Sequence, residues 1–232
     1  MVESRARAQA LVLAGRVFSG ERCLDKPGQQ VALDLKVELR LDEQLYVSRG
    51  GTKLAHALDH FQLDPAGRTA LDLGASTGGF TDVLLQRGAR RVYAVDVGHG
   101  QLDWRLRNDQ RVVVLERTNA RHLNQELIPE PVEVVVADTS FISLKLVLPA
   151  ALALAAPDAW LVALIKPQFE VGRGQVGKGG VVRDPALHQA VCEDIARWLA
   201  ERQGWQVQGI VESPITGPKG NREFLIAARR GR

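Results

Sequence analysis

The chain has 232 residues, of which 45% are hydrophobic and 25% are charged, and its formal net charge is +3. This length can bury one large domain and a small one, and the composition excludes a disordered or fibrous protein. The sequence pI of about 9.1 suits a polyanionic partner such as nucleic acid, although it does not establish one by itself.

Cysteine usage and hydropathy exclude further classes of protein. The two cysteines, Cys23 and Cys192, form no metal or redox motif and are expected to be reduced thiols of a cytoplasmic protein. Residues 1–10 lack the apolar core of a signal peptide. The most apolar stretch, residues 146–165, is interrupted by prolines, so we expect a core helix followed by a buried strand instead of a transmembrane helix.

The first 45 residues predict a small α+β domain. Residues 4–14 have a helical pattern, with Ser4 as the N-cap and Gly15 in the position of a C-terminal cap. Ser19-Gly20 is typical of a hairpin turn. Short strands are expected at 16–18, 22–24, 30–33 and 36–41.

From residue 69 onward, apolar strands alternate with helices. The expected strands are 69–74, 91–97, 112–117, 132–138, 160–166, 205–212 and 222–229. The expected helices are 52–62, 79–87, 100–107, 143–156 and 184–203. This alternation predicts an α/β domain with a parallel sheet covered on both faces, which binds ligands beyond the carboxyl ends of its strands.

The segment Leu71-Asp-Leu-Gly-Ala-Ser-Thr-Gly-Gly-Phe80 has the pattern of a strand, a glycine-rich turn and the start of a helix. Gly74 and Gly78 allow the backbone to approach a ligand closely, and Asp96, at the end of the next strand, can bind ribose hydroxyls. The turn has neither the three-glycine dinucleotide fingerprint nor the lysine of a P-loop, which favours S-adenosylmethionine as the ligand. The alternative is a tight turn whose glycines are purely structural.

Charged residues follow two of the apolar strands. Asp138 ends one apolar run, and Lys166, held extended by the proline after it, ends another. The segment after Asp138 lacks the Asp/Asn-Pro-Pro-aromatic pattern of methyltransferases that act on exocyclic amines, which favours an oxygen acceptor. The alternatives are a helix cap for Asp138 and an exposed strand end for Lys166.

Two more charged residues are expected at the same pocket. Lys53 opens a helix after the Gly-Gly turn of Arg49-Gly-Gly-Thr-Lys53, and Glu223 lies where the last strand begins. Two lysines and two carboxylates brought together can handle the proton of a weakly acidic hydroxyl. The glycine-rich, basic stretch 171–180 is expected to be either a loop that folds over a phosphate backbone or a flexible connection.

In combination, these motifs resemble the TlyA (hemolysin A) family. The matching stretches are Tyr46-Val-Ser-Arg-Gly-Gly-Thr-Lys-Leu-Ala, Leu71-Asp-Leu-Gly-Ala-Ser-Thr-Gly-Gly-Phe-Thr-Asp, Ala137-Asp-Thr-Ser-Phe-Ile-Ser-Leu, Lys166-Pro-Gln-Phe-Glu and Val176-Gly-Lys-Gly-Gly-Val-Val-Arg-Asp. The resemblance covers nearly the whole chain. It implies an FtsJ-like, Rossmann-like class I methyltransferase domain with a seven-stranded sheet at residues 46–232, preceded by an S4-like RNA-binding domain at residues 1–45.

The resemblance also implies roles for individual residues. Lys53, Asp138, Lys166 and Glu223 match the family's Lys-Asp-Lys-Glu catalytic tetrad, and we call them the tetrad. The family's cofactor-contacting positions are matched by Gly74, Ser76, Gly78, Phe80, Asp96 and Asn119. The implied cofactor is S-adenosylmethionine, with no metal, and the implied substrate is ribosomal RNA, usually at a cytidine ribose.

The N-terminal module departs from the family pattern. Met1-Val-Glu-Ser-Arg matches the start of the second helix of the S4 domain, so we expect the first helix of that domain to be missing here. Ser19 also replaces the asparagine that is common in the family's hairpin turn.

The favoured function is therefore an S-adenosylmethionine-dependent rRNA ribose 2′-O-methyltransferase. Lys166 would be the central catalytic group, and Asp138 and Glu223 would orient it and the hydroxyl, while the identity of the residue that carries the proton stays open. One alternative is a membrane-active hemolysin, as the family's older name implies, although the sequence contains no spanning segment. The other is a non-catalytic assembly factor that binds rRNA.

Overall fold

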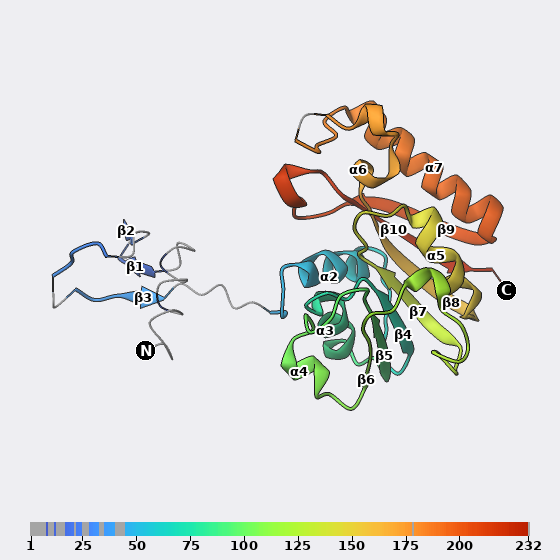
Figure 1. The fold of residues 1–232 in the computed structure, drawn as a ribbon, viewed down its shortest axis with the longest axis horizontal. Coiled ribbons are helices and arrows are strands. Elements are labelled where there is room, and N and C mark those ends of the chain that lie inside the picture. Colours follow the sequence, from blue (N-terminus) through green and yellow to red (C-terminus); the bar gives the residue numbers. More distant parts are fainter. Residues whose placement is uncertain are drawn as a thin grey trace. The chain divides into compact units, whose positions relative to one another are not determined.

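The computed structural model describes residues 17–20, 22–24, 28–32, 35–39, 45–177 and 179–231, together with Ala8 and Val12. The chain divides into two compact units, Met1–Leu45 and Tyr46–Arg232 (Figure 1). Each unit has its own sheet, and each is described by itself.

The first unit contains a small antiparallel sheet in the order β2-β1-β3. Its strands are Val17–Ser19 (β1), Arg22–Cys23 (β2) and Glu38–Leu39 (β3). Val17 and Leu24 are buried at its centre. The expected hairpin around residue 20 is therefore present.

Two other expectations for this unit have different outcomes. Residues 30–32 form no strand, because β2 and β3 occupy both edges of β1. The expected helix 4–14 lies outside the described residues except for Ala8 and Val12, which are helical.

The second unit is built on a seven-stranded sheet in the order β6-β5-β4-β7-β8-β10-β9. The strands are Thr69–Leu73 (β4), Arg91–Val95 (β5), Val112–Leu115 (β6), Val132–Ala137 (β7), Ala155–Ile165 (β8), Trp205–Glu212 (β9) and Phe224–Arg230 (β10). Strands β4 to β8 pair in parallel, as expected. Strand β10 instead runs antiparallel to β8 and β9, because a loop without a crossover α-helix joins it to β9.

Helices cover both faces of this sheet (Figure 1). The longer ones are Gly50–His60 (α2), Gly79–Gln86 (α3), Leu144–Ala153 (α5) and Pro185–Gln203 (α7). Leu54 of α2 and Leu84 of α3 pack on one face, and Leu148 of α5 and Ile195 of α7 pack on the other. Among the described residues, none of the helices combines the length and the apolar character needed to span a membrane.

Short helices complete the second unit. They are Trp104–Arg107 (α4) and Pro167–Glu170 (α6), with 3-10 turns at Ala120–His122 (η1), Arg173–Gln175 (η2) and Pro218–Gly220 (η3). Helix α4 begins four residues later than the expected 100–107, because the Asp103 side chain accepts a hydrogen bond from the Arg105 amide and caps it there. Strand β8 begins earlier than expected, because Ala155 already pairs with Val132.

The reversal of β10 determines where the last member of the tetrad lies. Phe224, the first residue of β10, pairs with Ile165, the last residue of β8. Glu223 therefore lies beside Lys166, at the edge where the parallel strands end. Asp96 and Asp138 follow β5 and β7 at this same edge.

Candidate active site

The tetrad converges into one chain of alternating charge. Lys53 Nζ donates to Glu223 Oε2 over 2.6 Å and lies 3.8 Å from Asp138 Oδ2. Lys166 Nζ lies 2.6 Å from Asp138 Oδ1 and donates to Ser140 Oγ over 2.9 Å. Both lysines are only 7% exposed and Glu223 is 1% exposed, so these charges interact in a largely dry environment.

The surroundings of Asp138 and Lys166 do not fit their structural alternatives. The cap of α5 is Ser143, whose Oγ accepts a hydrogen bond from the Lys145 amide over 3.2 Å, and not Asp138. Lys166 is buried, unlike an exposed strand-end lysine. The two side chains instead form an ion pair with each other, and the Asp138 carboxylate also lies near Lys53.

Close packing of α2 against α3 places Lys53 at this edge. A Cβ on Gly79 would lie 2.9 Å from the Gly51 amide nitrogen and would clash with Ser48 Oγ. Glycine at position 79 therefore lets the first turns of the two helices touch. Because Lys53 lies in the first turn of α2, its ammonium group reaches the sheet edge.

A cavity of about 300 Å³ connects the tetrad with the glycine-rich turn. A Cβ on Gly74 would lie 2.8 Å from the Asp138 carbonyl oxygen, and Gly74 has a φ of +78°, so only glycine fits there. Besides the tetrad, the cavity is lined by Ser48, Arg49, Gly50, Gly74, Ala75, Ser76, Thr77, Gly79, Phe80 and Ser140. The sequence-predicted residues Gly74, Ser76 and Phe80 are thus brought together with the tetrad.

Asp96 lines a smaller adjoining cavity that shares Ala75 and Ser76 with the first. Its carboxylate accepts hydrogen bonds from the Ser76 amide over 2.8 Å and from the Gly98 amide over 2.7 Å. Asp96 therefore orders the glycine-rich turn from the end of the neighbouring strand.

Gly78 and Asn119 line neither of these cavities. A Cβ on Gly78 would lie 2.9 Å from Leu102 Cδ1, so glycine is needed there for packing. The Asn119 side chain accepts a hydrogen bond from the Arg121 amide over 3.1 Å and caps η1.

Four lining residues with polar side chains were not singled out as site residues by the sequence patterns: Ser48, Arg49, Thr77 and Ser140. Ser140 matters most, because its hydroxyl is the acceptor for Lys166 Nζ. Each of the four lies within one of the motif stretches quoted above, and that position is the signal from which they could have been found.

An aspartate is buried beneath the glycine-rich turn. Asp72 of β4 is fully buried, and its Oδ2 accepts a hydrogen bond from Thr81 Oγ1 of α3 over 2.7 Å, while Oδ1 has no hydrogen-bond partner among the described residues. Burial raises the pKa of this carboxyl from 3.8 to about 7, opposed by the Thr81 hydrogen bond and reinforced by the charges of Asp138 and Asp96.

We expect Asp72→Asn to stabilise the protein increasingly as the pH rises. The folded state binds the Asp72 proton more tightly than the unfolded chain, so wild-type stability is lost between about pH 4 and pH 7. Asparagine removes this loss. The free energy of unfolding of the variant, relative to that of wild type, should therefore grow by roughly 2–3 kcal/mol from pH 5 to pH 8. Urea unfolding at both pH values measures it, and a gain that is the same at both would contradict the assignment.

Two further features of the described residues concern metal binding and thiol chemistry. No group of three or more His, Cys, Asp or Glu among them is arranged to hold a metal ion. Burial raises the pKa of the Cys192 thiol to about 11, which suppresses its thiolate.

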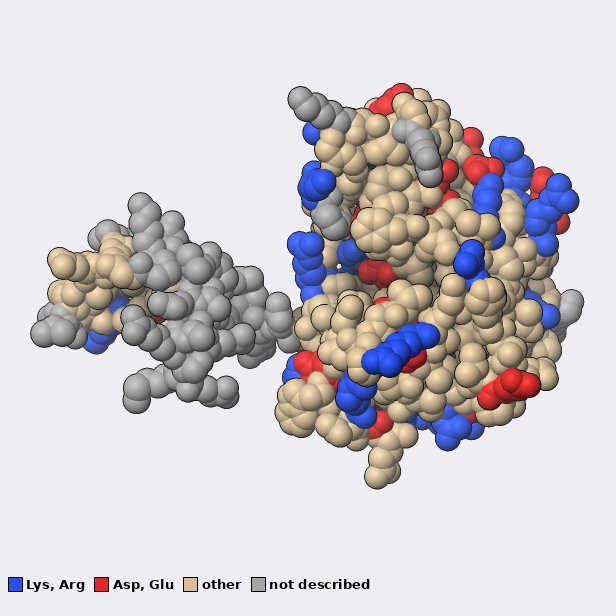
Figure 2. All heavy atoms as spheres, viewed as in Figure 1, with Lys and Arg blue, Asp and Glu red and all other residues tan. Residues whose placement is uncertain are grey.

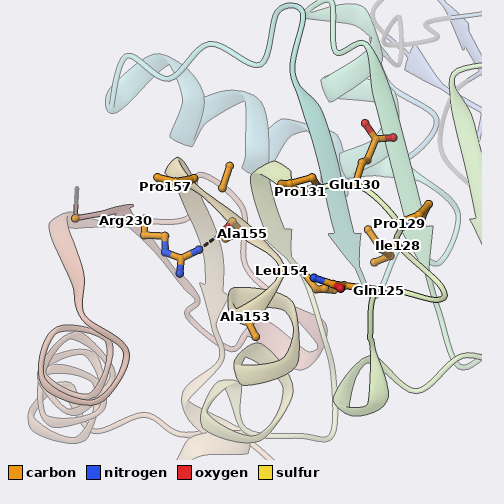
Figure 3. A pocket seen from close by; sticks show the side chains of 12 residues that line it. Gln125, Ile128, Pro129, Glu130, Pro131, Ala153, Leu154, Ala155, Pro157 and Arg230 are labelled. Carbon is orange, nitrogen blue, oxygen red and sulfur yellow. Dashed lines mark hydrogen bonds between the residues drawn. The ribbon is translucent and has the colours of Figure 1, made fainter.

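A second cavity, of about 450 Å³, lies away from the tetrad (Figure 3). Its lining comes from the segment before β7, the end of α5, the first residues of β8 and the end of β10, so it lies at the opposite edge of the sheet. Its charged groups are engaged: Arg230 donates to the Ala155 carbonyl, and Glu130 accepts from Arg91 and Tyr93. It contains none of the predicted site residues.

Comparison with known proteins agrees with the fold and the motifs. Residues 46–230 match the FtsJ-like methyltransferase family. The 16S/23S rRNA (cytidine-2′-O)-methyltransferase TlyA of Mycobacterium tuberculosis is 51% identical over 230 residues, which cover 99% of this chain and 85% of that protein. Hemolysin A of Brachyspira hyodysenteriae is 41% identical, with 96% of this chain and 92% of that protein covered.

A solved structure extends this likeness to three dimensions. A protein of Streptococcus thermophilus, described as a candidate hemolysin, superposes with a TM-score of 0.81 at 42% identity, covering 99% of this chain and 84% of that one. The expected seven-stranded methyltransferase fold is confirmed by the sheet order and by the family match. The chain belongs to the TlyA family of FtsJ-like methyltransferases.

Proposed function

We propose that this protein is a cytoplasmic, S-adenosylmethionine-dependent rRNA methyltransferase that modifies the 2′-hydroxyl of a cytidine ribose. The observation that carries the proposal is the buried Lys-Asp-Lys-Glu chain that opens into the same cavity as the glycine-rich turn. The name of the relative from Mycobacterium tuberculosis supports the choice of substrate.

The residues on the turn side of the cavity fit S-adenosylmethionine. Gly74 and Gly79 line this side of the cavity, so the turn presents backbone atoms to a ligand. Asp96 stands at the strand end where ribose hydroxyls are bound in Rossmann-like sites. Asp138 and Glu223, each paired with a lysine, line the other side of the cavity, and the cofactor, when bound, would supply the electrophilic methyl group.

The tetrad supplies the acceptor chemistry. Lys166 is held by Asp138 and Ser140, so its ammonium group has a fixed position from which it can orient a hydroxyl and stabilise the oxygen as its proton leaves. Glu223 holds the ammonium group of Lys53, which lies 3.8 Å from the second oxygen of Asp138. Positioning the hydroxyl in line with the methyl group then supplies much of the rate.

The rim of the cavity fits a nucleotide. Phe141, which follows Ser140, is 90% exposed and keeps a φ of +64°, which is unusual for a bulky residue. An exposed aromatic ring at this point offers a stacking surface for a base. Basic side chains also gather on the margin of the second unit where α2 begins and the β9–β10 loop lies (Figure 2), and Arg49 and Lys219 are exposed there.

We also propose that residues 1–45 are an S4-like RNA-binding domain. The motif resemblance supports this, and these residues form a compact unit of their own with a small antiparallel sheet. RNA binding by this unit would bring the rRNA to the methyltransferase domain.

Asp96→Ala is expected to weaken S-adenosylmethionine binding by about 1–3 kcal/mol, the range for losing hydrogen bonds to a charged group. The carboxylate would be lost both to the ribose and to the Ser76 amide. Calorimetry measures the affinity, with Asp109→Ala as the control, because Asp109 also accepts a backbone hydrogen bond but lines neither cavity. Equal affinities for wild type and a folded Asp96→Ala would remove Asp96 from the site.

The function itself is tested by incubating the purified protein with rRNA or ribosomal subunits and labelled cofactor. We expect label on the RNA, and mapping of 2′-O-methyl groups should place it on a cytidine ribose. Tight cofactor binding without transfer to any ribosomal RNA would refute the proposal. Leakage from liposomes under the same conditions would favour the hemolysin alternative.

A further inference from the structure

A buried side-chain amide joins two loops beside the tetrad. Asn221 lies between β9 and β10, two residues before Glu223, and is 4% exposed. Its Oδ1 accepts a hydrogen bond from the Val182 amide over 3.2 Å, and its Nδ2 donates to the Gly180 carbonyl over 3.0 Å. Gly180 ends the glycine-rich stretch 171–180, and Val182 lies in the segment between that stretch and α7.

The backbone of Asn221 supports Glu223 more directly. Its carbonyl accepts a hydrogen bond from the Gly217 amide over 2.8 Å and closes a tight turn. Gly217 in turn lies against the Glu223 side chain, because a Cβ added there would lie 2.6 Å from Glu223 Cδ. The turn closed by Asn221 therefore forms a wall of the space that holds the Glu223 carboxylate, on which Lys53 depends for its partner.

The other side of Val182 is also fixed. The His188 ring of α7 is 4% exposed, and its Nε2 is hydrogen-bonded to the Val182 carbonyl over 2.9 Å. The same ring lies 5.6 Å, centroid to centroid, from the ring of Phe224, which follows Glu223. Val182 is thus held between two side chains that flank the position of Glu223.

We propose that Asn221 is a positioning residue for the methyl transfer reaction, which holds the Glu223 carboxylate and the segment 179–182 as one unit. This inference rests on the proposed function, in which Glu223 belongs to the catalytic tetrad. Asn221 does not line the cavity and acts through Glu223. The Asn221 side chain would then link this segment to the tetrad, beside the hydrogen bonds that His188 makes to Val182 and Lys219 to Gly179.

Asn221→Ala is the test, and it should lower kcat by about 10–100-fold, since displacements of this kind far from the reacting atoms can cost about 10²-fold. The KM for S-adenosylmethionine should stay within about twofold of the wild-type value, because Asn221 does not line the cavity that would hold the cofactor. In the Glu223→Gln background, Asn221→Ala should cause no further loss, because both changes act on one group. Additive losses in this double-variant cycle would overturn the proposal.

Two further measurements keep the outcome separate from the proposed function. Amide hydrogen exchange at Val182 should accelerate at least about tenfold in Asn221→Ala, because its acceptor is removed. Asn124→Ala is the matched control, because Asn124 also accepts from backbone amides, at Glu126 and Leu127, and lines neither cavity near the tetrad; its kcat should equal that of wild type. Unchanged exchange at Val182 would overturn the positioning role of Asn221 even in a protein that methylates nothing. A wild type without rRNA methylation would overturn the proposed function alone.

Discussion

Lys166→Arg is expected to reduce methyl transfer by about 10²–10⁴-fold, the range for losing a positioned acid or base. The ammonium group of Lys166 is held between Asp138 Oδ1 and Ser140 Oγ in a buried position. A guanidinium is larger and planar, and it keeps its proton at neutral pH, so it can neither occupy this position nor exchange a proton there. Lys166→Ala should fail to the same degree, whereas cofactor affinity should stay near that of wild type in both variants.

Single-turnover methyl transfer to rRNA measures the loss of activity in the Lys166 variants. Calorimetry measures their affinity for S-adenosylmethionine. Lys145→Arg is the matched control, because Lys145 also forms an ion pair, with Asp194 of α7, but this pair is more exposed and lines neither cavity near the tetrad. If Lys166→Arg transfers methyl groups at the wild-type rate, lysine is only an electrostatic anchor and Asp138 becomes the better candidate for the base. If both Lys166 variants remain active, the catalytic assignment of the tetrad is wrong.

Lys53→Met is expected to lower the free energy of unfolding by about 3–5 kcal/mol, the range for removing one partner of a buried ion pair. The Glu223 side chain is fully buried and its Oε2 is bound by Lys53 Nζ. Methionine preserves most of the volume of the lysine but leaves the carboxylate without its counter-charge. Chemical denaturation of the purified variant measures the loss.

The double variant Lys53→Met/Glu223→Gln separates stability from catalysis. Because it removes both charges, it should recover most of the lost stability, yet it should still transfer no methyl groups. Lys145→Met, which breaks the more exposed pair with Asp194, should cost less than about 1 kcal/mol. A double variant as unstable as Lys53→Met would show that the buried pair is not the source of the effect.

The sequence predicted the site best where local patterns coincide with strand ends. Asp138 and Lys166 end runs of apolar residues, and such runs form buried parallel strands whose carboxyl ends share one edge. That reasoning does not depend on knowing which strands are neighbours. The placement of both residues at the site could therefore be inferred from the sequence.

Long-range features could not be inferred in the same way. The position of Glu223 beside Lys166 depends on the antiparallel pairing of β10 with β8, which no local pattern in the sequence specifies. The hydrogen bonds of Asn221 span 39 and 41 residues. Asp72 did leave a signal, an acidic residue between two leucines, but its nearly neutral pKa follows from packing against α3 and from the charges around it.

The place of β10 in the sheet has a consequence for biosynthesis. This strand follows all the others in the chain, yet it lies between β8 and β9. Among the described strands, β9 pairs only with β10. During translation β9 emerges before β10, so it cannot join the sheet until residues 224–230 have left the ribosome. Glu223 directly precedes β10, so it reaches its position in the tetrad in the same step. An rRNA-modifying enzyme built in this way would remain inactive on the ribosome that is making it until β10 has emerged and paired.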